Sequence, residues 1–484
     1  MIHAKHARWP LMLAAGFLFA ACLARVHAAP ADEPADTLRA GDPAAHGLDK
    51  AKLDTLRAIL NKAVADGVMP GASLLVAHRG EIIFKEAVGT FTPDDEARMA
   101  SDTKPTTAAV VMMVVEEGKL SLDDTISKYV PEFKGTPVEN ATIRQLLSHT
   151  GGVGGNYPGG RPTSGTLAEF ARLIAREGTL KPPGKFSYSG VSIDLAARAA
   201  EAAAGVPFEE LARTRLWKPL GMSHTSYSLA ADAASVSAED AARGEGRYVS
   251  GGGGLSSTLD DFAAFYQMFA QGGRYAGKTI LSEASIAAMH TPIGRNERYV
   301  NSPSEWGPDY GLGFYLSRSD ESGKPRTIHH GGALGTMAWA DLDHDVTAVF
   351  FSQVGLAKAA PVIVALQKQT RRIIAGDSNE ATDVAVQPAP PAADAPSEPA
   401  ENPAGGRLGG RVDLAARFKQ ISEGNETITR EQYLKNVASI GSGKARPRLG
   451  EQIFDRLDEN KDGELTLDEY RKIGSMFGAR RGKQ

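Results

Sequence analysis

The sequence predicts an α+β domain, in which one antiparallel sheet is flanked by helices and carries an inserted helical subdomain, followed by a small all-α module. Strand-like segments stand near both ends of the region 42–375, with mostly helical sequence between them, so both ends should contribute strands to one sheet. A Pro/Ala-rich stretch over 376–410 then separates this region from residues 411–484. With 484 residues, 42% hydrophobic and 23% charged, the chain suffices for two globular domains.

Residues 1–28 have the pattern of an export signal. A positively charged start precedes a mostly apolar core from Trp9 to Ala24, and Val26-His27-Ala28 offers a small-residue cleavage site. We therefore expect a bacterial protein that is periplasmic or secreted. The only cysteine, Cys22, lies inside this segment, and Phe19-Ala20-Ala21-Cys22 is close to a bacterial lipobox. A lipoprotein anchored through Cys22 is therefore the alternative.

Charge and hydropathy limit the expected partners. The formal net charge is −4, which gives no basis for expecting a nucleic-acid partner. After the N-terminal segment, no apolar stretch is long enough to cross a bilayer, so we expect no stable membrane span. The mature chain would contain no cysteine, so export is not used here to form disulfides.

The first elements of the region 42–375 are a helix and a hairpin. Apolar residues at helical spacing predict a helix over Asp49–Ala65. Ala72–Ala77 and Ile82–Ala87 are strand-like, and the short polar segment His78-Arg79-Gly80-Glu81 joins them. This arrangement predicts an antiparallel hairpin.

Strands return near the end of the same region. They are expected at Thr327–His330, Met337–Asp341 and Thr347–Ser352, where β-branched and apolar residues gather. A last helix over roughly Ala359–Ala375 closes the domain. Pro361 then falls in the first turn of that helix, where a proline is tolerated.

A buried helix begins beside a serine in the first half of the chain. The run Ala108–Val115 is too apolar for a surface helix, and Gly118 suits its C-terminal cap. Pro105 is tolerated only in a first turn, so the helix begins near Ser101 and directs its positive dipole end at that hydroxyl. Lys104 lies three residues on and faces the same way. A partly desolvated lysine held there can take the hydroxyl proton of Ser101.

The pattern Ser101-x-x-Lys104 is weak by itself, because a capped helix with a solvated lysine gives the same pattern. Two later segments, Val115–Asp124 and Ile143–Thr150, strengthen it. Together these stretches resemble the serine β-lactamase and penicillin-binding-protein superfamily, and within it the class C β-lactamase and family VIII carboxylesterase branch. The resemblance covers about 42–374. It implies an active site in the crevice between the sheet and the helical part.

The segment Lys181–Gly190 resembles the second motif of that superfamily, Tyr-x-Asn. The resemblance implies that Tyr188 faces Ser101, and nearby lysine charge would help its phenol to act as base and acid. A half-buried loop aromatic without a chemical role is the alternative. Gly190 stands where the motif has Asn, whose amide orients an acylamino carbonyl of the substrate. Its absence weakens the case for penicillins and peptidoglycan peptides and favours simple esters.

The segment Ile328–Thr336 resembles the third motif, Lys-Thr-Gly, in a His-x-Gly form. His330 occupies the first position and is expected on the substrate side, with a purely structural histidine as the alternative. Gly332 lets a substrate approach the backbone. The family pattern implies an oxyanion hole formed by the N–H groups of Ser101 and Ala333.

Two conspicuous features receive no chemical role. His149 lies in a motif that looks structural in the family. The run Gly251–Gly254 lacks the Gly-Lys-Ser/Thr ending of a phosphate loop, so we expect a structural loop near the site. No group of His, Asp and Glu in this domain has the pattern of a metal site, and we expect no cofactor for catalysis.

Residues 376–410 are too rich in proline, alanine and glutamate to form a core, so we expect a disordered linker. Beyond it, Asp458–Glu469 fits the calcium loop of an EF-hand throughout. Calcium takes six to eight oxygen ligands. The expected donors are the side chains of Asp458, Asn460 and Asp462, the backbone carbonyl of Glu464 and the bidentate carboxylate of Glu469.

The segment Phe418–Tyr433 resembles a second EF-hand that has lost a residue and its first aspartate. We expect Ile428 to pack against Leu465 of the intact hand, without firm calcium binding by the degenerate one. One structural calcium ion is therefore predicted.

The expected function is that of an exported serine hydrolase acting through a Ser101 acyl-enzyme, most simply a carboxylesterase on small-molecule esters. The first rival is a β-lactamase or a D-Ala-D-Ala carboxypeptidase-like enzyme, which would act on an amide. The second is a non-catalytic calcium-dependent binding protein, a reading that Asp102 beside the nucleophile and Gly190 keep open.

Overall fold

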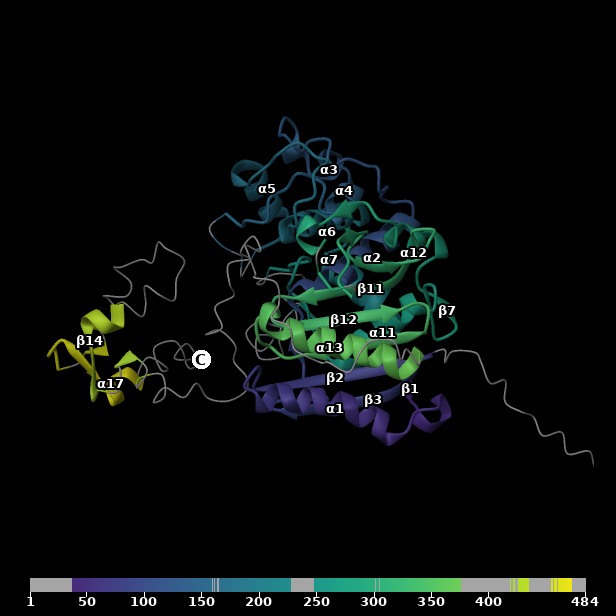
Figure 1. Cartoon of the computed structure of the whole chain (residues 1–484). Coiled ribbons are helices and arrows are strands. Elements are labelled where there is room, and N and C mark those ends of the chain that lie inside the picture. The colour runs from purple at the N-terminus through teal and green to yellow at the C-terminus, as the bar shows by residue number, and fades with distance from the viewer. Residues whose placement is uncertain are drawn as a thin grey trace, which may run out of the picture.

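A computed structural model places the two ends of the main domain in one sheet (Figure 1). The predicted export signal (1–28) and linker (376–410) lie outside the residues that the structure describes. Among the described residues, no helix is both long and apolar enough to cross a membrane. The structure describes residues 37–227 and 248–375, except 159, 161, 163, 164, 301 and 304, and the segments 418, 421–422, 425–434, 454–455, 457–458 and 460–471.

The sheet has nine strands in the order β1-β3-β2-β13-β12-β11-β10-β9-β8. The predicted N-terminal hairpin and C-terminal strands are neighbours in it, because β2 pairs with β13. The expectation of a purely antiparallel sheet is wrong at one edge, where β1 runs parallel to β3. A parallel pair needs a crossover connection, which the intervening helix supplies. The strands are β1 Arg39–Ala40, β2 Gly71–His78, β3 Glu81–Gly89, β8 Gly294–Arg295, β9 Asp309–Tyr310, β10 Tyr315–Ser319, β11 Pro325–Gly332, β12 Thr336–Asp341 and β13 Val346–Phe351.

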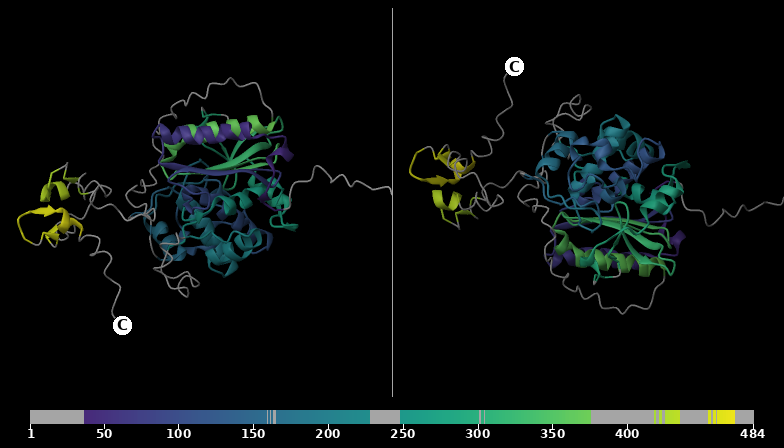
Figure 2. Two further views of the ribbon diagram at one scale, coloured as in Figure 1. Left: turned by 90° about the horizontal axis from the view of Figure 1, so that it is seen from below. Right: turned by 90° about the horizontal axis from the view of Figure 1, so that it is seen from above.

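Two helices, α1 (Lys50–Ala65) and α13 (Leu356–Ala375), lie side by side on one face of the sheet (Figure 2). Asp49 caps the predicted first helix through the backbone N–H of Lys52. The second helix begins earlier than expected, so Pro361 lies inside it and not in its first turn. The N–H of Leu356 bonds to the carbonyl of Ala333, which fixes this early start beside the β11–β12 turn.

The opposite face of the sheet carries the helical part (Figures 1 and 2). The predicted buried helix is confirmed as α2, which is buried along almost its whole length. Two short antiparallel strand pairs, of which only the second is a hairpin, and several single turns accompany the helices. The helices are α2 Thr103–Glu116, α3 Ile126–Tyr129, α4 Ile143–Leu147, α5 Leu167–Glu177, α6 Gly190–Ala204, α7 Phe208–Ala212, α8 Lys218–Leu220, α11 Leu259–Ala270 and α12 Glu283–Met289. The remaining elements are β4 Ala97–Arg98, β5 Ser256–Ser257, β6 Arg274–Tyr275, β7 Lys278–Thr279, the 3₁₀ turns η1 Pro43–His46, η2 Ala100–Asp102, η3 Pro131–Phe133 and η5 Glu297–Tyr299, and the π turn η4 Arg213–Trp217.

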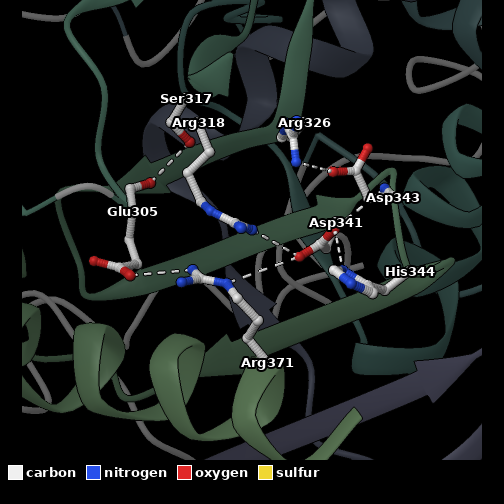
Figure 3. Close-up of polar contacts among 8 residues, drawn as sticks. All are labelled: Glu305, Ser317, Arg318, Arg326, Asp341, Asp343, His344 and Arg371. Carbon is white, nitrogen blue, oxygen red and sulfur yellow. Dashed lines mark hydrogen bonds and ion pairs between the residues drawn. The ribbon is translucent and has the colours of Figure 1, made fainter. Parts of the chain in front are cut away.

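An ion-pair network fastens α13 to the strands (Figure 3). The guanidinium of Arg371 lies 3.0 Å from the buried carboxylate of Glu305. Asp341, at the end of β12, contacts Arg318 and His344, each at 3.0 Å. The opposite charges of this network pair with one another, which is what buried ions require. The network therefore positions the helix over the sheet.

The C-terminal segment forms a small unit of its own. Strand β14 (Thr427–Thr429) pairs antiparallel with β15 (Glu464–Thr466), and Ile428 lies opposite Leu465 as the sequence predicted. Helix α17 (Leu467–Arg471) follows directly. A cluster of buried apolar side chains, which includes Phe418 and Phe454, packs around this pair.

Candidate active site

Ser101 lies in the turn η2, directly before α2, where the sequence predicted the helix to begin. The preceding residue, Ala100, has a φ of 46°, in the left-handed region that a non-glycine residue seldom adopts. Neighbouring contacts hold this strained turn. Thr103 Oγ1 donates to the carbonyl of Ala100 at 2.7 Å, and the N–H of Met99 donates to the carbonyl of Leu255 at 2.8 Å. Strain maintained in this way is typical of functional positions.

Lys104 contacts the nucleophile candidate directly. Its Nζ lies 2.8 Å from Ser101 Oγ and 2.7 Å from the carbonyl oxygen of Gly252, and the whole side chain is buried. Because a carbonyl oxygen can only accept, one N–H of the amine points at Gly252. In the neutral amine, the nitrogen lone pair can then face the serine hydroxyl. The pair therefore has the geometry of a nucleophile and its base.

The glycine run Gly251–Gly254 holds this lysine, although the sequence suggested only a structural loop. A Cβ on Gly252 would lie 2.5 Å from the carbonyl oxygen of Gly190, so the two backbones touch. Asp194, fully buried on α6, accepts from the N–H of Gly252 at 2.7 Å. Only glycine permits this close approach, and the approach puts the Gly252 carbonyl within reach of Lys104.

Tyr188 and His330 complete the cluster. The ring of Tyr188 lies beneath Lys104, with 4.7 Å between Nζ and the ring centroid. Its hydroxyl lies 3.5 Å from His330 Nε2, at the hydrogen-bond limit. Four of the predicted residues, Ser101 included, are thus brought together by α2, a loop and strand β11.

The contacts of His330 assign its proton. Nδ1 lies 3.0 Å from the carbonyl oxygen of Gly331, so Nδ1 carries the hydrogen and Nε2 is an acceptor. The hydroxyl of Tyr310 lies 3.2 Å from that acceptor, closer than the hydroxyl of Tyr188. Burial and the nearby charge of Lys104 hold the pKa of His330 well below its usual range. Burial also raises the pKa of Tyr310 well above its usual range, so both rings are neutral.

The β11–β12 turn brings the predicted oxyanion donors to the nucleophile. A Cβ on Gly332 would lie 2.2 Å from the carbonyl oxygen of Met99, and Thr336 Oγ1 donates to the same oxygen at 3.0 Å. This contact puts the end of β11 against the turn that carries Ser101. Ala333, the next residue along the turn, is exposed to solvent, so a substrate can reach its backbone.

Sequence reasoning missed several residues that contact this cluster. Tyr310 lies far from Ser101 along the chain, so no local pattern points to it. For Gly252 the sequence predicted a structural loop near the site but no contact with Lys104. From the sequence, Asp102 only supported the non-catalytic alternative. Its carboxyl is completely buried, and burial raises its pKa well above the usual range, with Thr336 and Lys104 acting in the opposite direction.

The predicted calcium ligands extend from the loop that begins at Asp458, through β15, into α17. The backbone N–H groups of Asp462 and Gly463 donate to the two carboxyl oxygens of Asp458 at 3.2 and 3.0 Å. Asn460 Oδ1 accepts from the N–H of Asp462 at 3.1 Å, and Glu464 accepts from the hydroxyl of Thr427 in β14. Gly463 has a φ of 84°, which gives the sharp turn that such a loop needs.

Glu469 caps the first turn of α17. Its Oε2 accepts from the N–H and the hydroxyl of Thr466 at 2.9 and 2.8 Å. In the part of the chain that the structure describes, no three His, Cys, Asp or Glu side chains are grouped so that they could hold a metal ion. The oxygen donors of the predicted ligands nevertheless suit calcium chemically.

Comparison with known proteins agrees with this geometry. The family model described as Beta-lactamase matches residues 56–363. The chain is 26% identical over 340 residues to Protein Rv1367c of Mycobacterium tuberculosis, covering 59% of this chain and 84% of that protein. It is 25% identical over 350 residues to Esterase EstB of Burkholderia gladioli, covering 60% and 87%.

A solved structure extends the comparison to the fold. EstCE1, described as a hydrolase with promiscuous acyltransferase activity, matches with a TM-score of 0.56 at 21% identity, covering 67% of this chain and 98% of that chain. At this identity the match establishes the shared fold alone. Since the family model spans more than half of the sequence, the chain belongs to the beta-lactamase family of serine hydrolases.

Proposed function

We propose that this protein is a carboxylesterase of the family VIII type that hydrolyses small esters through an acyl-enzyme on Ser101. The observation that carries the proposal is the buried Lys104 amine, 2.8 Å from Ser101 Oγ. The similarity to Esterase EstB supports an ester as the substrate. The glycine at position 190 adds to that support, because it offers no side-chain amide to an acylamino group.

In the acylation step, Ser101 Oγ forms a bond to the ester carbonyl carbon as its proton passes to Lys104 Nζ. The carbonyl oxygen becomes an oxyanion, which the N–H groups of Ser101 and Ala333 stabilise. The bond to the alcohol then breaks, and the leaving oxygen takes a proton from Tyr188. Lys104 returns its extra proton to the phenolate, so both groups regain their initial states.

In the deacylation step, water attacks the acyl carbon while the neutral amine of Lys104 accepts its proton, and the bond between the acyl carbon and Ser101 Oγ then breaks. The acid is released as the proton passes to Ser101 Oγ. His330 stays neutral during both steps and orients the phenol through Nε2, which Tyr310 also contacts. A neutral imidazole in place of the lysine of the Lys-Thr-Gly motif leaves less positive charge for a substrate carboxylate. That difference again favours uncharged esters over penicillins.

The test is hydrolysis of a short-chain p-nitrophenyl ester by the full-length mature protein beside Ser101→Ala. Turnover by the wild type and its loss in the variant would support the proposal, whereas unchanged turnover in Ser101→Ala would overturn the nucleophile assignment. Efficient turnover of a chromogenic cephalosporin, with little ester hydrolysis, would favour the β-lactamase or peptidase alternative. Neither turnover nor labelling of Ser101 by a fluorophosphonate probe would favour a non-catalytic binding protein.

We also propose that residues 411–484 form an EF-hand pair with one structural calcium site. The five oxygen donors on the Asp458–Glu469 loop and the pairing of Ile428 with Leu465 support this proposal. Calorimetric titration of the calcium-free full-length protein should give one ion per chain. A stoichiometry of two would show that the first hand also binds, and no heat would contradict the site.

Export is the last part of the proposal. We infer that residues 1–28 are removed, giving a periplasmic or secreted protein that begins at Ala29. The alternative is lipid attachment at Cys22. The intact mass of the protein from its native host separates the two, because a lipidated N-terminus at Cys22 retains seven further residues and gains acyl chains.

A further inference from the structure

His149 has a backbone conformation that is uncommon for a non-glycine residue. It lies just after α4 with a φ of 60°, in the left-handed region, and only 1% of its surface is exposed. Few non-glycine residues adopt this region, although histidine does so more often than most. The contacts of a buried residue held there therefore bear on its role.

Two of those contacts are hydrogen bonds to the residues that flank Tyr188 in the sequence. The carbonyl oxygen of His149 accepts from the N–H of Ser187 at 2.7 Å. The ring atom Nδ1 accepts from the N–H of Ser189 at 3.2 Å. The residues immediately before and after Tyr188 are therefore both bonded to the same histidine, which leaves the Tyr188 peptide little freedom to move.

The imidazole also packs against the phenol ring. The ring centroids of His149 and Tyr188 lie 4.5 Å apart, and Tyr310 contacts the same imidazole at 4.8 Å. Phe186 closes another side with an edge-on contact at 5.8 Å. The position of the Tyr188 ring is thus set by a rigid, buried neighbour as well as by its own backbone.

The second nitrogen of the imidazole has no evident structural use. Nε2 is buried and has no hydrogen-bond partner among the described residues. Burial and the charge of Lys104 keep the pKa of His149 well below its usual range, so the ring is neutral and Nε2 carries the proton that Nδ1 lacks. The other titratable groups that face it are Tyr188, Tyr310 and His330. A buried donor left unpaired costs stability, so stability alone does not explain this histidine.

We propose that His149 is the positioning residue for Tyr188, holding its phenol between Lys104 Nζ and His330 Nε2 during proton transfer. The inference rests on the proposed function, in which Tyr188 moves the proton of the leaving group. A displaced phenol lowers the rate of the chemical step and leaves ground-state binding of the ester largely intact. The loss should therefore appear in kcat and not in KM.

Two substitutions separate positioning from folding. His149→Gly accepts the left-handed φ without strain and removes both the ring and the Nδ1 acceptor. His149→Asn also tolerates that φ, and its Oδ1 can still accept from the Ser189 N–H. We expect kcat to fall about 10- to 100-fold in His149→Gly, with a partial recovery in His149→Asn and KM within about twofold of wild type. His290→Asn is the matched control and should leave kcat unchanged, because this buried histidine packs on Phe269 and Phe314 and has no recorded contact with Tyr188.

A double-mutant cycle with Tyr188→Phe tests whether His149 acts through the hydroxyl of Tyr188. If His149 acts through the phenol, His149→Gly should have little further effect once that hydroxyl is absent. An equal fold-loss in both backgrounds, or a lower Tm with an unchanged kcat, would overturn the proposal. Wild-type turnover of the p-nitrophenyl ester tests the proposed function separately. If the wild type cleaves a cephalosporin instead, or only reacts with the fluorophosphonate, the same cycle is measured with that reagent.

Discussion

The amine of Lys104 is hydrogen-bonded to two oxygens from segments far apart in the sequence. These are Ser101 Oγ at 2.8 Å and the Gly252 carbonyl oxygen at 2.7 Å. The first contact makes the lysine a base for the serine, and the second fixes the direction of its N–H groups. The amine that contacts Ser101 is therefore held by a backbone carbonyl 148 residues away from Lys104 in the sequence.

Replacing the amine should abolish the first step. In Lys104→Met the side chain remains apolar and of similar length, but Ser101 has no proton acceptor, so kcat/KM for a p-nitrophenyl ester should fall by at least about 100-fold. The Gly252 carbonyl also loses its donor, which should lower the free energy of unfolding by about 1–3 kcal/mol. Steady-state kinetics and urea unfolding measure the two effects. Lys185→Met, at an exposed lysine of the same loop as Tyr188, is the control and should change neither.

A methyl group at position 252 should displace the lysine. In Gly252→Ala the new Cβ would lie 2.5 Å from the carbonyl oxygen of Gly190 and 2.8 Å from its Cα, so a backbone has to move. We expect a loss of about 1–3 kcal/mol in unfolding free energy and a drop of at least about tenfold in kcat. Gly355→Ala meets no atom within 4 Å and serves as the control. Equal kinetics in the two variants would show that the Gly252 carbonyl does not position Lys104.

Acid should destabilise the fold through buried histidines. Burial lowers the pKa of His290 from 6.5 to about 4, so the unfolded chain binds a proton at this site before the folded one does. Its contribution to stability is therefore fully present above pH 6.5 and is lost as the pH falls toward 4. Each pKa unit corresponds to about 1.4 kcal/mol, so the loss at this site is roughly 3 kcal/mol.

Urea unfolding between pH 7 and pH 4.5 measures this effect. His290→Phe, which keeps an aromatic ring against Phe269 and Phe314, should show a smaller fall in stability over that range than the wild type. A fall of the same size in both proteins would place the acid sensitivity elsewhere, for example at His329, whose pKa burial lowers to about 3.

Calcium should act on the C-terminal unit and not on catalysis. Glu469 is the predicted bidentate ligand of the ion, and Glu469→Gln replaces one of its two carboxylate oxygens by an amide nitrogen that cannot ligate calcium. We expect calcium affinity to fall at least about tenfold in Glu469→Gln, with ester turnover within about twofold of wild type. Titration calorimetry and an activity assay with chelator check both statements. A large loss of turnover on chelation would show that the two parts are coupled.

The sequence by itself determined the helices and strands whose formation depends on the preferences of neighbouring residues. The apolar run of α2, the helical spacing of α1 and the β-branched and apolar strand segments each follow from backbone and side-chain preferences within a few residues. The spacing of Ser101 and Lys104 likewise fixed their common direction, because residues three apart share one helix face. These predictions required no knowledge of the rest of the chain.

Only the tertiary structure decided which segments that are remote in the sequence contact one another. The parallel pairing of β1, the helical position of Pro361 and the contact of the Gly252 carbonyl with Lys104 each depend on partners from other segments of the chain. His149 is the clearest case, since its bonds to the neighbours of Tyr188 exist only after α4 and the Tyr188 loop are brought together. Side-chain spacing specifies local geometry, whereas long-range contacts arise only when the whole core closes.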